Sequence, residues 1–89
     1  MTVGTQNWRL ILAAARALTA AGQSPFPRIA VYQWIWWRHS QADHDRPTLD
    51  PTFQGMIENA PGGPPSAGGT PLCRVARGRY VLADQATGS

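Results

Sequence analysis

The chain is 89 residues long, has a formal net charge of +3 at pH 7, and takes all eight of its cations from arginine. This length allows one small domain and leaves no room for a deep substrate cavity beside its core. One cysteine excludes an intramolecular disulfide and a cysteine-based zinc site, and no apolar run is long enough to cross a bilayer, so we expect a cytoplasmic protein.

The first predicted helix spans residues 5–21. Its buried stripe is expected to contain the apolar residues that recur at helical spacing, which are Trp8, Ile11, Leu12, Ala15 and Leu18. Gly22 is expected to end this helix. Two prolines in residues 24–27 predict a short extended link with a single β-bridge, and Pro27 suits the first turn of the helix that follows.

The second predicted helix spans residues 28–40 and is apolar on more than one side. One arc is expected to face the core and contains Ala30, Val31, Trp34, Ile35 and Trp37. Ile29, Tyr32 and Trp36 lie on the opposite arc. They are either covered within the monomer, which we favour because exposed apolar patches are uncommon in monomers, or form a contact surface for a second subunit or another protein.

The third predicted helix follows a polar loop over residues 41–49. Asp50 is expected to be the N-cap, with Pro51 in the first helical position, and the helix is expected to reach Asn59. Its core stripe is predicted to be Phe53, Met56, Ile57 and Ala60. Pro61 ends the helix, and residues 62–71 are rich in glycine, proline and serine, so they are interpreted as a mobile connector.

Residues 71–82 predict a β-hairpin whose two-residue turn is Arg77-Gly78. The predicted cross-strand pairs are Ala76 with Arg79, Val75 with Tyr80, Arg74 with Val81, and Cys73 with Leu82. Alternation then gives an inner face of Cys73, Val75, Tyr80 and Leu82 and an outer face of Arg74, Ala76, Arg79 and Val81. Residues 84–89 are expected to form a flexible tail.

Helix, extended link, helix, loop, helix, connector and hairpin is the element order of a winged helix-turn-helix domain. The predicted fold is therefore α+β and mostly helical, with one domain over residues 1–83 and the hairpin as its wing.

Parts of the chain also resemble a known family. They are residues 46–57, the Asn59-Ala60-Pro61 run, residues 69–72 and residues 74–82. These stretches resemble an uncharacterised family of small winged-helix domains that occur in GC-rich bacteria, alone or fused to nuclease-type domains. The end of the hairpin is also similar to the wings of winged-helix modules in restriction and transcription proteins. The resemblance covers residues 14–82 and implies the winged-helix fold, and no nuclease motif of the fused relatives is present.

Charge is distributed unevenly along the chain. Residues 1–40 contain four arginines and no acid, residues 41–60 contain four acids and one arginine, and residues 61–89 contain three arginines and one acid. The three hairpin arginines, Arg74, Arg77 and Arg79, are predicted to contact the phosphates of double-stranded DNA, with Arg77 near the minor groove. The alternative is a solvated ribbon face.

The outward face of the third helix is the predicted base-reading surface. It contains Thr52, Gln54, Gly55 and Asn59, and the two amides carry the donor and acceptor that suit adenine. Arg46 and Thr48 precede the predicted helix, where phosphates are usually held. An ordinary polar face is the alternative, and Asp50 and Glu58 oppose tight docking.

The chain shows no convincing catalytic or metal-binding pattern. His39, Asp43, His44 and Asp45 lack the spacing of a helical zinc motif and are interpreted as parts of a solvated loop. Cys73 is expected to act as a small buried hydrophobe. We therefore predict a DNA-binding protein without catalysis or cofactor, either a transcriptional regulator or a DNA-recognition module. A homodimer is one option for its assembly. The alternative is a protein-interaction adaptor that uses the second helix.

Overall fold

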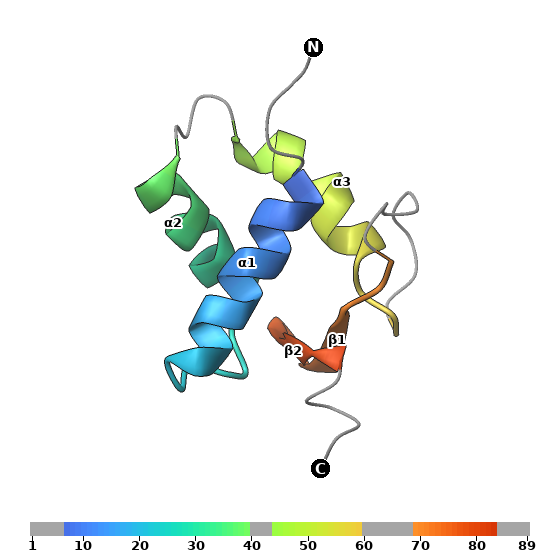
Figure 1. The fold of residues 1–89 in the computed structure, drawn as a ribbon. Helices are drawn as coiled ribbons and strands as arrows, with labels where there is room; N and C mark the ends of the chain where they lie inside the picture. Colours follow the sequence, from blue (N-terminus) through green and yellow to red (C-terminus); the bar gives the residue numbers. More distant parts are fainter. Residues whose placement is uncertain (1–6, 40–43, 60–68, 84–89) are drawn as a thin grey trace.

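A computed structural model describes residues 7–39, 44–59 and 69–83 (Figure 1). Its elements, in chain order, are α1 (Asn7–Ala20), α2 (Arg28–Arg38), α3 (Arg46–Gly55), β1 (Leu72–Ala76) and β2 (Arg79–Leu82). Three helices followed by a two-stranded antiparallel hairpin confirm the predicted α+β winged-helix layout. The predicted connector lies mostly outside the described residues, and the predicted tail lies wholly outside them. No described helix is both long and apolar enough to span a membrane.

Helix α1 packs against both other helices and against β2. It ends as predicted, because Gly22 adopts a φ of +78° and the Gln23 N–H donates to the Leu18 carbonyl, 2.9 Å away. The buried face is broader than the predicted stripe. Leu10 and Ala14 are buried, whereas Trp8 and Leu12 are partly buried at its edges. The extra breadth follows from α1 having three neighbours.

Helix α2 is apolar on two sides because the monomer covers both. Val31, Tyr32 and Ile35 are fully buried, and Ile29 and Trp36 pack partly buried against the core. Coverage within the monomer, the favoured interpretation, therefore holds fully for Tyr32, which a partner cannot reach, whereas Ile29 and Trp36 are covered in part. A core position for Trp37 is wrong, because its side chain is 85% exposed. At about 100° per residue, Trp37 lies nearly opposite the buried Ile35.

Helix α3 begins at Arg46, five residues earlier than predicted. Its N-cap is Asp45, whose carboxylate accepts hydrogen bonds from the Thr48 backbone N–H at 3.1 Å and from the Thr48 hydroxyl at 2.5 Å. Asp45-Arg46-Pro47 and Asp50-Pro51 both have the residues of a helix start, and the earlier one prevails because it buries Leu49. Pro51 lies inside the helix, whose two halves run in different directions (Figure 1).

The C-terminal end of α3 is also earlier than predicted, at Gly55 instead of Asn59. The backbone leaves the helix because Ile57 forms a parallel bridge with Leu72, and the Met56 carbonyl accepts from the Leu72 N–H at 3.0 Å. Phe53, Met56 and Ile57 are buried as predicted. Ala60, the fourth residue of the predicted stripe, lies outside the described residues.

The N-cap of α3 gives a direct stability prediction. Replacing Asp45 by alanine removes the acceptor for the Thr48 N–H and is expected to lower the free energy of unfolding by about 1 kcal/mol. Urea denaturation followed by circular dichroism measures this change. Asp45→Asn keeps a capping oxygen and should stay within about 0.5 kcal/mol of the parent chain. An equal loss in both variants would contradict the assigned cap.

The hairpin has the predicted turn and a different register. Ala76 pairs with Arg79 across Arg77-Gly78, as predicted, and Gly78 adopts a φ of +71°. A β-bulge at Val75 then shifts the remaining pairs by one residue. The observed pairs are Arg74 with Tyr80, Cys73 with Val81, and Leu72 with Leu82.

The bulge changes which hairpin residues are buried. Val75 is 49% exposed and Cys73 is half-buried, while Val81, predicted on the outer face, is buried with Tyr80 and Leu82. The predicted burial of Tyr80 and Leu82 is confirmed, and that of Val75 is wrong. Strand β2 has neighbours on both edges, because Phe26 and Tyr80 exchange two backbone hydrogen bonds of 2.9 Å. This bridge confirms the one predicted for the link before α2.

Candidate nucleic-acid interface

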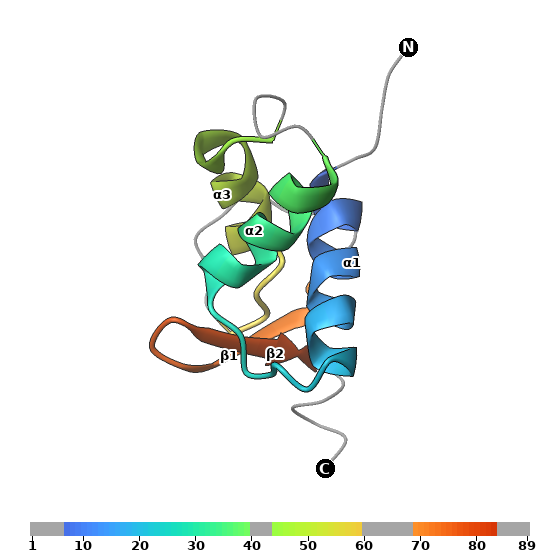
Figure 2. The ribbon, with the colours of Figure 1, turned by 90° about the vertical axis from the view of Figure 1, so that its left-hand side faces the viewer.

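The tip of the hairpin and helix α3 project on the same side of the molecule, opposite α1 (Figure 2). Arg77 occupies the hairpin turn and Arg79 opens β2, and both are exposed. Within the described part of the chain, no side chain forms an ion pair or hydrogen bond with either guanidinium. Two positive charges are therefore presented to solvent beside α3.

Backbone contacts fix the hairpin relative to α3. The Asn59 side-chain amide donates to the Arg74 carbonyl at 2.7 Å and accepts from the Arg74 N–H at 2.8 Å. The bridge between Ile57 and Leu72 joins the same two segments. The residues just after α3 therefore hold the first part of β1 in a fixed position relative to the C-terminal end of α3.

Arg28, the first residue of α2, links α2 to α3. Its guanidinium lies 3.3 Å from a carboxylate oxygen of Asp50, donates to the Gln54 side-chain oxygen at 3.1 Å, and sits 4.6 Å from the centre of the Phe53 ring. The Tyr32 hydroxyl donates to the same Asp50 oxygen. Asp50, which was expected to oppose docking on DNA, is thus neutralised by Arg28.

These contacts shift the pKa values of two members of the group. Burial raises the pKa of the Tyr32 hydroxyl, and its hydrogen bond to the Asp50 carboxylate raises it further, against smaller lowering effects from Arg28 and Arg46. Burial lowers the pKa of Arg28, but Tyr80, Tyr32 and Asp50 together outweigh it and raise that pKa. Tyr32 therefore stays a neutral donor, and Arg28 stays charged, throughout the physiological range.

The raised pKa of Tyr32 predicts a loss of stability in alkali. Above pH 10 the unfolded chain releases the tyrosine proton while the folded chain keeps it, so the free energy of unfolding should fall by up to about 1.4 kcal/mol per pH unit. Urea denaturation between pH 8 and about pH 11 measures the slope. Tyr32→Phe should have a shallower slope over this range, and identical slopes in the two proteins would refute the assignment.

The N-terminal part of α3 contains two of the predicted phosphate-binding residues. Arg46 is the first residue of the helix and is exposed, with its guanidinium 5.8 Å from the centre of the Tyr32 ring. Thr48 lies in the first turn and uses its hydroxyl to bond the Asp45 cap. Both residues are therefore in the helix and not in a loop before it, and Arg46 keeps its charge at the surface.

The predicted base-reading residues do not form one face. Thr52, Gln54 and Gly55 lie half-buried in the second half of α3, and the Gln54 oxygen already accepts from Arg28. Asn59 lies beyond the helix, and both its donor and its acceptor are bonded to the Arg74 backbone. A bidentate contact from Asn59 to adenine would break that clamp, so its observed role is to hold the hairpin.

Arg28 is the member of this surface that sequence reasoning missed. Its position at the start of α2 separates it from Asp50 and Gln54 by 22 and 26 residues, so helical spacing does not connect them. The sequence offered one weak signal: residues 1–40 contain no acid, so any ion pair formed by Arg28 must involve an acid from later in the chain.

Within the described residues, the loop between α2 and α3 does not bring metal ligands together. His39 and His44 stack edge-on with ring centres 5.8 Å apart, and His44 Nδ1 lies 3.2 Å from the Asn7 side-chain oxygen. Among residues 7–39, 44–59 and 69–83, no three His, Cys, Asp or Glu side chains converge as metal ligands. Asp43 lies outside those ranges.

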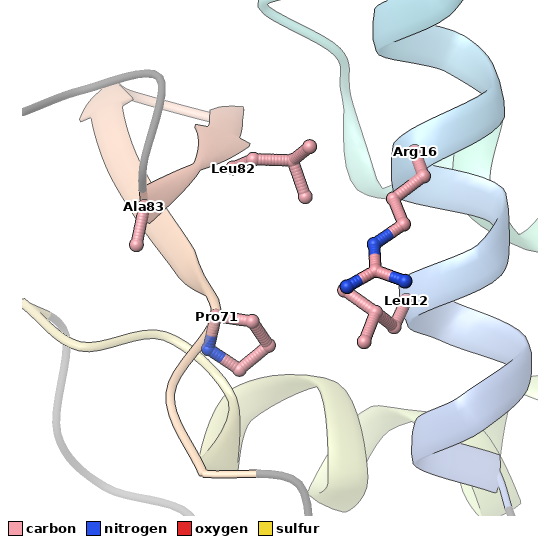
Figure 3. A pocket seen from close by; sticks show the side chains of 5 residues that line it. All are labelled: Leu12, Arg16, Pro71, Leu82 and Ala83. Atoms are coloured by element: carbon pink, nitrogen blue, oxygen red, sulfur yellow. The ribbon is translucent and has the colours of Figure 1, made fainter. Parts of the chain in front are cut away.

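A cavity of about 270 Å³ separates α1 from the base of the hairpin (Figure 3). Arg16 hangs beside Leu12 on α1, and Leu82 and Pro71 face it across the gap. The lining residues are Leu12, Arg16, Pro71, Leu82 and Ala83. This lining offers one guanidinium and no side-chain carboxylate, imidazole, thiol or hydroxyl, so it does not assemble acid–base or nucleophilic chemistry.

One family model matches residues 6–82, and its description is "Domain of unknown function (DUF7669)". The chain belongs to this family. The match covers the three helices and the hairpin. No curated protein and no solved structure matches the chain.

Proposed function

We propose that this domain binds double-stranded DNA without catalysing a reaction on it. The observation that carries the proposal is the placement of Arg77 and Arg79, exposed at the tip of a ribbon beside α3 and unpaired by any described residue. An exposed cluster of arginines next to a helix is the electrostatic footprint of a protein that contacts the phosphate backbone.

The surrounding residues support the same surface. Arg46 adds a third exposed cation at the start of α3, and Arg28 neutralises Asp50 on its flank. We assign phosphate contacts to Arg46, Arg77 and Arg79, and a base contact to Thr52, because Gln54 accepts from Arg28 and Asn59 holds the hairpin. Arg74 contributes a fourth exposed charge on β1. Such a module would act as a small transcriptional regulator or as a DNA-recognition unit that works with a partner.

The proposal is tested by fluorescence anisotropy with a labelled mixed-sequence duplex at several salt concentrations. Three phosphate contacts predict that the logarithm of the binding constant falls with the logarithm of salt with a slope of about −3. Binding that is absent at low salt would refute the proposal, and so would binding whose affinity does not change with salt.

A further inference from the structure

The second distinctive surface of the domain is a groove between α1 and α2. Its volume is about 530 Å³, and its walls come from the C-terminal half of α1, the residues just after it, and α2. The lining residues are Ala17, Leu18, Ala21, Gln23, Ala30, Gln33, Trp34, Trp37 and Arg38. None of them belongs to α3 or to the hairpin, so the groove is separate from the proposed DNA surface.

Trp37 stands at this groove with 85% of its surface exposed, the largest exposure among the described large hydrophobic residues. Trp34 lies beside it, half-buried, with the Arg38 guanidinium 4.6 Å from its ring centre. The α1 wall of the groove includes the small side chains of Ala17 and Ala21, so this wall is shallow. Tryptophan and arginine around an apolar depression are the residue types that dominate binding energy at protein interfaces.

Charge indicates what kind of partner fits. Arg38 is exposed in the lining of the groove, and residues 1–40, which include both helices that form the groove, contain no acid. A second copy docked through the same face would bring another Arg38 and no acid from either helix to pair with it, which opposes self-association. A partner that carries both carboxylates and apolar side chains would instead complement the surface.

We propose that the α1–α2 groove binds an acidic amphipathic helix of another protein. Apolar anchors at helical spacing would fill the depression beside Trp37, and an acidic residue flanking them would pair with Arg38. The inference goes beyond DNA binding and does not depend on it, because the two surfaces share no residue. A partner bound in the groove would recruit the proposed DNA-binding domain.

The test begins with a library of random 16-residue peptides displayed on phage and selected against the wild-type chain. Peptides that survive are synthesised, and their affinity is measured by fluorescence anisotropy. We expect enriched peptides to be net acidic, with apolar residues three or four positions apart. Trp37→Ala should weaken binding about thirty-fold and Arg38→Glu about ten-fold, as expected for residues at the centre of an interface.

Two controls make the result specific. Arg77→Glu makes the same charge change on the hairpin and should alter peptide affinity less than about two-fold. Circular dichroism should show that Trp37→Ala is folded, as expected for an exposed side chain. Enriched peptides that are neutral or basic would overturn the proposal, and so would equal affinity of the peptides for wild type and Trp37→Ala. Dimers of the wild-type chain that Trp37→Ala abolishes would also overturn it, because they would assign the groove to a second copy. A chain that binds DNA and no acidic peptide would refute this inference alone.

Discussion

Replacing Arg77 and Arg79 together by glutamine is expected to lower the affinity for duplex DNA by one to two orders of magnitude at about 0.1 M salt. Each lost phosphate contact reduces the salt slope by about 1, so the double variant should lose about 2 units of slope. Both side chains are exposed, and within the described residues nothing pairs with them, so their removal breaks no internal contact. Anisotropy titrations at several salt concentrations measure both quantities.

A matched variant, Arg9→Gln with Arg16→Gln, removes the same charge from α1. Helix α1 lies on the side opposite the hairpin tip (Figure 2). The affinity of this variant for duplex DNA should therefore fall less than about three-fold. If the two double variants lose affinity equally, DNA responds to net charge alone and the assigned surface is wrong.

Replacing Phe53 by alanine is expected to remove a large part of the free energy of unfolding. Phe53 is fully buried, and the rings of Tyr32 and Tyr80 meet it edge-on, with centres 5.9 Å and 5.0 Å away. Arg28 covers one face of the ring. Removing a buried phenylalanine costs about 3–5 kcal/mol, which is comparable with the total stability of a small domain, about 5–15 kcal/mol.

Thermal and urea denaturation followed by circular dichroism check this prediction. Trp37→Ala is the matched control, because it removes a larger aromatic ring that is mostly exposed, and it should change stability by less than about 1 kcal/mol. Phe53→Leu keeps most of the side-chain volume and should fall between the two. A cooperative transition near that of wild type in Phe53→Ala would contradict the assigned core.

Features set by local sequence were predicted correctly. The Arg77-Gly78 turn, the glycine stop after α1 and the extended link before α2 each depend on a few adjacent residues whose backbone preferences point one way. The start of α3 was predicted incorrectly, because Asp45 and Asp50 both satisfy the local rules for a helix N-cap. The choice between them depends on Leu49 reaching the core, which is a property of the assembled helices.

Errors in the candidate site have the same origin. The bulge at Val75 lies in a hairpin whose second strand also pairs with Phe26, and simple alternation along a hairpin contains no information about a bulge or a second neighbour. Trp37 is exposed because α1 covers the other side of α2, while tryptophan alone predicts burial. Asn59 was expected to face DNA, and its contact with Arg74 spans fifteen residues.

The most direct test of the DNA-binding surface is a two-dimensional ¹⁵N–¹H NMR titration of the labelled chain with a mixed-sequence duplex. Binding through α3 and the hairpin predicts that the largest shift changes fall on residues 46–55 and 74–80, while the lining of the α1–α2 groove stays unchanged. Shift changes concentrated on α1 and α2, or none at all at low salt, would contradict the account.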